Sequence, residues 1–596
     1  MANSFGSLYV GASGLQGASH GLNTTANNLT NVNTEGYVRE QVVYEDRNYR
    51  QIGWASISDQ FAGLGVDVGT IVHKRDIFLD KAYRTENGRY SFYSASAEAV
   101  DEVQTFLQEQ EGVAFKDAIK DFYEAFAEFA KDPSDTVNQN LVLQKASLFL
   151  SRSGAIQDGL EDYQTIINSK IIEDVDRINE IGEQILDYNK RIQAIEAAGV
   201  EKAMELRDKR DLLIDELSGL AKITYREDAF SVVHIEIEGT EFVDEIHCNA
   251  IGKYKDLTTG FITPYWVNLT TDEDLAKDPP EPYQVFDLSR ISAETNTDLG
   301  EIKSLLLARG DSWTNYLNFL DDDGVQLDAD TYNSGIANSI MMNAESELDT
   351  LIHQLVTDIN DLFSPLTTLE ESYDGATAIS YTDSNGNPVT ADGTVKILDV
   401  ANASVGTDGE LPPRELFVRN GCERYYLATC TVTYEDGTTE ERSLYLYNEE
   451  DPDDTSKCYT LKSLTINTDL EKQEAYLPHL LYSAQDTVNY ELGTQLEALW
   501  SATGFNLNPA DTTPSTYTEF YTKWIGEIGT IGNIYSSTAS SLQTTSEQIE
   551  FSRQGVIGVS SDEELTTMIK YQSAYNAASR YINVIDEMIE HLITSL

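Results

Sequence analysis

Proline is missing from both ends of this 596-residue chain, since the first of its 13 prolines is Pro133 and the last is Pro514. Because proline breaks helices, both ends are free to form long helices, and turns and strands are expected in the middle. No Lys or Arg precedes Arg39, so the basic segment of a cleaved secretory signal is absent. No apolar run approaches the roughly 20 residues that span a bilayer, and we expect no membrane insertion.

Motifs of catalysis and metal binding are absent as well. The seven histidines are scattered, none lies in an HExxH arrangement, and no GxSxG or GxxxxGK[ST] segment occurs. We therefore expect no enzyme, no catalytic residue and no cofactor. The segment FLDDDGVQLDAD resembles an EF-hand loop at Asp321, Asp323, Gly324 and Asp330, but Phe319 falls at the first ligand position and has no oxygen. A solvated acidic loop is the expectation, with adventitious calcium as the alternative.

Cysteine and positive charge are both scarce. The cysteines are Cys248, Cys422, Cys430 and Cys458, none of them in a CxxC pair, so we expect no zinc site. Cys422 and Cys430, if they share a strand, lie about 26 Å apart, too far for a disulfide, and buried free thiols are expected. The formal charge of −59 repels nucleic acid and anionic membranes, so neither is expected as a partner.

Apolar periodicity divides the chain into helical and β-rich segments. Residues 76–220 have apolar residues three and four apart, as do Ile178, Ile181 and Ile185, which predicts long helices. Residues from about 223 to 266 are β-branched and aromatic, which favours strands. Near residues 415–448, alternating segments flank the dipeptides at 420–421 (Asn-Gly) and 436–437 (Asp-Gly), which predicts a three-stranded meander with type I′ turns.

The two ends of the chain carry apolar stripes that each need a partner helix. At the N-terminus, the stripe consists of Leu8, Leu15, Leu22 and Leu29. At the C-terminus, the stripe has alternating steps of three and four: Met568, Tyr571, Tyr575, Ala578, Ile582, Ile585, Ile589, Leu592 and Leu596. We predict that these stripes pair as a coiled coil and form the assembly interface. Ser561 and Glu564 have the spacing of a capping box at the start of the C-terminal helix.

Glycine is unusually frequent in the first predicted helix. Each of Gly6, Gly11, Gly14, Gly17 and Gly21 costs about 0.8–1 kcal/mol relative to alanine. Small residues permit close approach of another helix in return. We expect this end to be disordered in the free monomer and to order on assembly, which amide exchange of residues 5–30 would test.

The expected fold is a multidomain α+β protein whose N- and C-terminal helices pair as a coiled coil. An α-helical bundle forms the body, and β-rich domains are inserted in the middle of the chain. The expected domains are a terminal coiled coil (1–60 and 560–596), a helical body (61–225 and 485–559), a mixed middle domain (226–365) and a β-rich outer domain (366–484).

Several segments carry a family resemblance. The opening SGLQGASHGLNTTANNLTNVNTEGYVRE resembles the N-terminal signature of bacterial flagellar rod, hook and hook-associated axial proteins. Further blocks are similar, in the same order, to the members of that family at the hook–filament junction: GLGVDVGTIVHKRDIFLDKAYR, RDKRDLLIDELS, NAESELDTLIHQLVTDIN and GVSSDEELTTMIKYQSAYNAASRYINVIDEMIEHLI. The resemblance covers residues 1 to about 225, about 300–365 and about 485–596. For about residues 366–480 we recognise no counterpart in the family, whose members vary most in this region.

The resemblance implies a structural role outside the cell. Proteins of this kind are exported unfolded through the flagellar type III pathway and form a ring at the hook–filament junction, with their paired terminal helices lining the inner tube. The implied partners are the hook protein, the second hook-associated junction protein, an export chaperone and further copies of the chain. Two alternatives stay open: another axial protein such as the hook subunit, and a flagellum-borne adhesin or enzyme module in the central β insertion.

Overall fold

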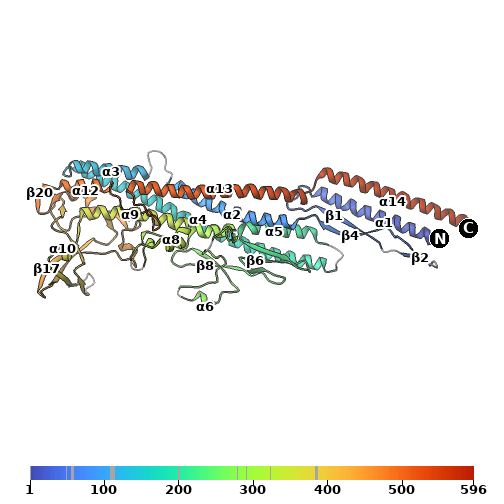
Figure 1. The fold of residues 1–596 in the computed structure, drawn as a ribbon, viewed down its shortest axis with the longest axis horizontal. Coiled ribbons are helices and arrows are strands. Elements are labelled where there is room, and N and C mark those ends of the chain that lie inside the picture. Colours follow the sequence, from blue (N-terminus) through green and yellow to red (C-terminus); the bar gives the residue numbers. More distant parts are fainter. Residues whose placement is uncertain are drawn as a thin grey trace.

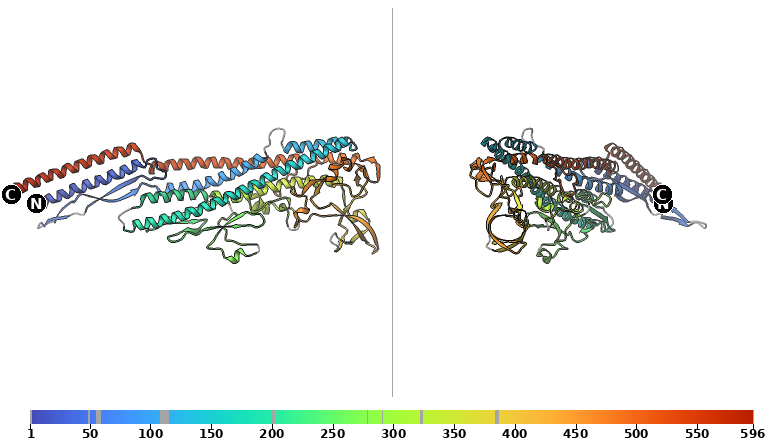
Figure 2. Two further views of the ribbon diagram at one scale, coloured as in Figure 1. Left: turned by 180° about the vertical axis from the view of Figure 1, so that it is seen from behind. Right: turned by 60° about the vertical axis from the view of Figure 1, so that its left-hand side comes forward.

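The molecule is long and narrow, and both chain termini lie at the same end of it (Figure 1). The computed structural model describes residues 2–595 except 48–49, 55–58, 108–114, 199–201, 278, 290, 322–323 and 383–386. Paired terminal helices form one end, long helices form the body, and β-rich lobes lie against the body (Figures 1 and 2). The fold is thus multidomain α+β, as predicted.

The terminal unit consists of two antiparallel helices with a β-hairpin beside them (Figure 1). Its helices are α1 (Ala2–Thr30) and α14 (Ser561–Ser595), and its strands are β1 (Glu40–Asp46), β2 (Arg50–Trp54), β3 (Asp59–Ala62) and β4 (Val66–His73). β1 pairs with β4, and β2 pairs with β3, both antiparallel. The hairpin contacts α1, where Gly17 faces the side chains of Tyr44 and Val66.

Helices build the body, most of them long, as the apolar periodicity predicts. They are α2 (Ile77–Leu107), α3 (Phe115–Lys131), α4 (Thr136–Glu196), α5 (Met204–Leu220), α7 (Glu301–Arg309), α9 (Ile340–Phe363), α12 (Tyr490–Leu499) and α13 (Tyr517–Ile557). The 61 residues of α4 extend about 90 Å at 1.5 Å per residue. This helix starts directly after Pro133, where the Asp135 side chain accepts a hydrogen bond from the Val137 N–H.

The strands after α5 share one hydrophobic core with these helices. They are β5 (Ile223–Glu227), β6 (Val233–Ile237), β7 (Thr240–Val243), β8 (Ile251–Lys255) and β9 (Ile262–Trp266). Their buried side chains, Ile235 and Trp266 among them, belong to the same cluster as Ile178 of α4 and Leu348 of α9. Short helices α6 (Asp272–Leu275) and α8 (Ala329–Ser334) complete this region.

The outer region has a small core of its own under a six-stranded antiparallel sheet of order β10-β13-β17-β16-β11-β12. The strands are β10 (Leu366–Thr368), β11 (Ala376–Thr382), β12 (Pro388–Asp392), β13 (Lys396–Leu398), β16 (Tyr425–Tyr434) and β17 (Thr439–Tyr447). Shorter elements join it to the body: α10 (Leu369–Ser372), β14 (Ser404–Val405), β15 (Phe417–Arg419), β18 (Leu464–Ile466), α11 (Thr468–Lys472), β19 (Leu480–Leu481) and β20 (Ala484–Val488).

The predicted three-stranded meander is wrong in one strand. β16 and β17 form the expected hairpin around residues 436–437, but β15 pairs with β18 instead of β16. The turn type also differs, because a type I′ turn needs positive φ at both central residues, and here only Gly437 (φ 80°) has it. The hairpin instead has an ordinary turn, and Gly437 adopts the left-handed backbone conformation at its end.

All four cysteines are free thiols, with Cys430 and Cys458 buried and the other two half-buried. Of the EF-hand-like loop, Asp323 lies outside the described residues. Asp321 accepts a hydrogen bond from the Val325 N–H at 2.8 Å, which closes a local turn. Asp330 lies in the first turn of α8.

Candidate assembly interface

The helix pair at the tip packs through small residues of α1. A methyl group added at Gly11 would lie 2.7 Å from Ile582 Cγ1, and one at Gly21 would lie 2.6 Å from the ring of Tyr571. Both glycines are buried, as are the other members of this row except the half-buried Gly14. The row, which we call the small-residue seam, consists of Gly11, Gly14, Ala18, Gly21, Thr25 and Asn28. Its steps alternate between three and four, which is the spacing of a coiled-coil contact.

The predicted leucine stripe of α1 is not this contact. Leu8, Leu15, Leu22 and Leu29 lie one residue further round the helix, and each stays half-buried. The physical reason is distance, because glycine lets the backbones approach more closely than leucine would. The pairing of the two ends is therefore seen in the structure, but through different residues of α1.

The C-terminal stripe does face α1 along most of its length. Ile585 is buried, and the next most covered members are half-buried: Met568, Tyr571, Ala578, Ile582 and Ile589. Tyr575 and Leu592, at 37% and 42% exposed, are only partly covered, and Leu596 lies outside the described residues. The stripe therefore supplies large side chains to the small-residue seam.

Asn28 closes the seam at its inner end. Its side-chain N–H₂ donates to the Glu40 carbonyl at 3.0 Å and to the Glu564 carboxylate at 3.2 Å. Its side-chain oxygen accepts from the Glu40 N–H at 3.0 Å and from the Tyr37 hydroxyl at 2.9 Å. Because Asn28 is only 1% exposed, this one amide ties α1, β1 and α14 together.

Glu564 serves this network rather than a capping box. Its carboxylate also accepts from Arg39 Nε at 2.7 Å, and the Arg39 backbone N–H donates to the Ile557 carbonyl at 2.9 Å. The predicted Ser561–Glu564 box is wrong, because Ser560 precedes the helix and its hydroxyl accepts from the Glu563 N–H at 3.5 Å. The chain between α13 and α14 is thus held by the segment that follows α1.

Buried ionisable groups continue this contact into the body. The Asp208 carboxylate of α5 accepts from the Val38 N–H at 3.0 Å, and burial raises the pKa of Asp208 to about 7. His73 Nδ1 lies 3.4 Å from that carboxylate, and burial lowers the pKa of His73 to about 4. His73 is therefore neutral at pH 7, and the contact does not depend on an imidazolium.

Next to these groups, Asp215 of α5 lies between two arginines. Arg84 Nε of α2 and Arg553 Nη2 of α13 each donate to it at 2.6 Å, and all three side chains are buried. Paired in this way, the charges fix α2, α5 and α13 relative to one another directly below the terminal unit. We call the contacts of residues 28–40, Asp208 and Asp215 the joint.

The joint was missed by the sequence reasoning, although two signals point to it. Asn28 continues the three-and-four spacing of the small-residue seam, so a polar side chain falls at a buried position. Glu564 likewise extends the C-terminal stripe by one step, and a buried carboxylate needs a cation or several N–H donors. Arg39 supplies the cation.

The terminal pair and the joint consist of helix packing, hydrogen bonds and ion pairs. In the described part of the chain, no three His, Cys, Asp or Glu residues are placed to hold a metal ion. None of the described helices combines the length and apolarity needed to cross a membrane. At the end of the molecule where the two termini lie, the exposed elements are α1, α14 and the β-hairpin beside them (Figure 1).

Both ends and the middle of the chain match models of known protein families. Models of flagellar rod proteins match both ends of the chain: "Flagella basal body rod protein" over residues 8–37 and "Flagellar basal body rod FlgEFG protein C-terminal" over residues 553–595. The model "Flagellar hook-associated protein FlgK helical domain" matches residues 100–365. The chain is therefore an axial structural component of the bacterial flagellum.

Two relatives, one of them matched over nearly its full length, narrow this class. Flagellar hook-associated protein 1 of Bacillus subtilis is 22% identical over 606 residues, covering 100% of this chain and 99% of the relative. Its namesake in Escherichia coli is 24% identical over 214 residues, 35% of this chain and 38% of the relative. Over its full length the chain is thus similar to flagellar hook-associated protein 1, as the resemblance predicted. The solved hook junction protein FlgK of Burkholderia pseudomallei covers 80% of this chain, and all of that structure is matched, with 12% identity and a TM-score of 0.45.

Proposed function

We propose that this protein forms the junction between hook and filament, as a ring of copies joined through their terminal helices. The observation that carries the proposal is the α1–α14 pair, which extends beyond the body and leaves large apolar side chains such as Ile569, Val584 and Met588 exposed. Such a surface suits a polymer, in which neighbouring chains cover it. The role is structural, without catalysis.

Export and partners follow from the same proposal. The chain leaves the cell unfolded through the flagellar type III pathway, with a chaperone bound to the α14 segment before export. Outside the cell, its partners are the hook protein on one side and the second hook-associated junction protein on the other. The expected absence of order in α1 of the free monomer belongs here too, because a glycine-rich helix has little stability of its own in water and depends on its pairing with α14.

Deleting residues 562–596 tests the proposal. We expect a soluble protein that does not join the hook tip, so that cells build hooks without attached filaments. A finer version compares Ile585→Asp, which buries a charge in the pair, with Asn583→Asp, an exposed position two residues away. Antibody labelling of isolated flagella should place the wild-type chain at the junction. Attached filaments on cells that carry the deletion would refute the assignment.

A further inference from the structure

Each terminal helix carries a second apolar stripe beside the stripe that faces its partner helix. The residues of this outer stripe stay half-buried or exposed, although Tyr581 of α14 also reaches α1, where it lies 3.1 Å from a methyl group added at Gly11. On α1, the outer stripe runs at steps of four and three next to the small-residue seam: Leu8, Ala12, Leu15, Ser19, Leu22, Ala26 and Leu29. On α14, the outer stripe has the same spacing next to the stripe that faces α1: Ala574, Ala577, Tyr581, Val584 and Met588. Neither outer stripe contains a buried residue. Each helix therefore has the pattern for two helix contacts, and the second stripe is only partly covered within one copy.

Charge distinguishes these stripes from the rest of the molecule. The chain carries a formal charge of −59, yet residues 1–34 contain no Asp, Glu, Lys or Arg. The outer stripe of α14 is also uncharged, although Val584 and Met588 are 52% and 61% exposed. Copies of so acidic a chain repel each other, so a contact between copies needs surface without carboxylates.

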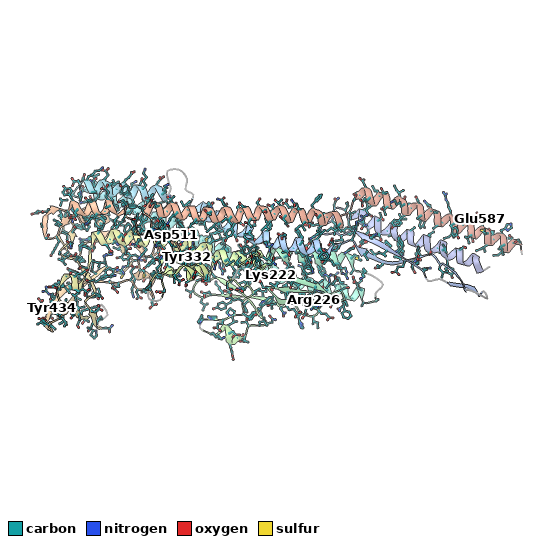
Figure 3. The ribbon with its side chains drawn as sticks, in the orientation of Figure 1. Lys222, Arg226, Tyr332, Tyr434, Asp511 and Glu587 are labelled. Atoms are coloured by element: carbon teal, nitrogen blue, oxygen red, sulfur yellow. The ribbon has the colours of Figure 1, made fainter. Side chains whose placement is uncertain are left out.

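The two outer stripes face opposite sides of the pair. Successive helix residues turn by about 100°, and the outer stripe follows the inner one by one residue on α1 but precedes it by one residue on α14. Because the helices are antiparallel, these opposite offsets turn the two outer stripes to opposite sides. Glu587, by contrast, projects from α14 into solvent near the tip (Figure 3).

We infer that the outer stripe of α1 in one copy packs against the outer stripe of α14 in the next copy. The inference rests on the proposed ring, whose subunit contact it assigns to particular residues. Leucines meet a row that begins with alanines and ends with Tyr581, Val584 and Met588, so large and small side chains can interdigitate. A contact between two different faces of the same chain propagates from copy to copy and closes as a ring or continues as a helix.

The acidic charge of the chain opposes a contact between two free copies. Isolated copies are therefore expected to stay apart in dilute solution, and the contacts become effective together on the hook tip. The contact between copies also assigns a role to the leucines of α1, which lie beside the small-residue seam within one copy.

A charge-exchange experiment in the full chain tests the contact. The acidic variant carries Leu15→Asp and Leu22→Asp, and the basic variant carries Val584→Lys and Met588→Lys. We expect each alone to lower the amount of chain on isolated hook tips at least tenfold. The combined variant should recover most of this loss, because the acidic stripe of one copy then meets the basic stripe of the next. Within one copy the stripes face opposite sides, so an internal ion pair cannot produce the recovery.

The matched control adds the same charges one residue further round α1, as Gln16→Asp and Asn23→Asp, both at exposed positions. We expect the control to assemble like the wild type. A combined variant no better than the acidic one would overturn the inference, because it would assign the leucines to a different partner. An equally defective control would overturn it too, since added charge alone would then explain the loss.

A photo-crosslinking residue at Leu15 provides a second test that needs no charge. In flagella assembled from a mixture of isotopically light and heavy chains, adducts should join residue 15 of one copy to residues 574–588 of another. Adducts within one copy, adducts to a different protein, or no adducts would each contradict the inference. A wild-type chain missing from the hook tip would instead refute the proposed function, so the two failures are distinguishable.

Discussion

The glycines of the small-residue seam allow a sharp test of the terminal pair, because three similar substitutions are expected to differ in sign. Alanine at any of these positions stabilises an isolated helix by about 0.8–1 kcal/mol. At Gly14 the added methyl would lie 3.7 Å from Ala578 Cβ, an ordinary contact. At Gly11 it would lie 2.7 Å from Ile582 Cγ1, and at Gly21 it would lie 2.6 Å from the ring of Tyr571, so these side chains or the helices that carry them must shift.

The magnitudes follow from these distances. Overpacking of this kind costs about 1–3 kcal/mol, which exceeds the gain in helix propensity. We expect Gly14→Ala to stabilise the pair by up to about 1 kcal/mol, and Gly11→Ala and Gly21→Ala each to destabilise it by about 1 kcal/mol. The difference of about 2 kcal/mol between Gly14→Ala and the other two variants corresponds to about 30-fold in the equilibrium constant for separation of α1 from α14.

Amide exchange of α1 measures this equilibrium residue by residue. If α1 exchanges freely in the isolated chain, as we expect from its glycine content, the same three variants are compared in assembled flagella. Equal protection in the Gly11→Ala, Gly14→Ala and Gly21→Ala chains would refute the reasoning, because it would mean that the backbones do not approach closely at this seam.

Three further predictions concern the buried polar groups. Asn28→Ala should destabilise the terminal unit by about 1–3 kcal/mol, since the partners of Asn28 lose their hydrogen bonds. The control Asn23→Ala, at an exposed position, should not destabilise it. Amide exchange of α14 measures both effects. Asp215→Asn should lower the free energy of unfolding by about 3–5 kcal/mol, because two arginines lose a buried partner. The control Glu216→Gln breaks an exposed ion pair and should lower it by only about 0–1 kcal/mol, and thermal unfolding measures both. Burial raises the pKa of Glu347 from 4.5 to about 8, so the folded state holds its proton where the unfolded state does not. The stability from that proton is complete below about pH 4.5 and is lost as the pH rises through about 8. The unfolding temperature of Glu347→Gln should therefore depend less on pH than that of the wild type. Parallel curves of unfolding temperature against pH for the two chains would contradict this.

Local periodicity in the sequence was enough to predict the helices and the meeting of the two ends. The stripes around Ile178 and Ile582 repeat at three and four residues, and such a stripe is stable only when another element covers it. The absence of proline before Pro133 and after Pro514 indicated helices at both ends, but strands β1 to β4 interrupt the N-terminal end between residues 40 and 73. The pairing of β16 with β17 was predictable for the same reason, because its turn is local.

Tertiary structure decided which face of each helix meets which partner. On α1, the leucines looked like the contact because they are the most apolar residues, but Gly11 and Gly21 allow the shorter distance between backbones and therefore face α14. β15 pairs with β18, some 45 residues later, and Glu564 bonds to Arg39 across most of the chain. Contacts between such distant residues depend on shape and on the pairing of buried charges, which periodicity along one segment does not encode.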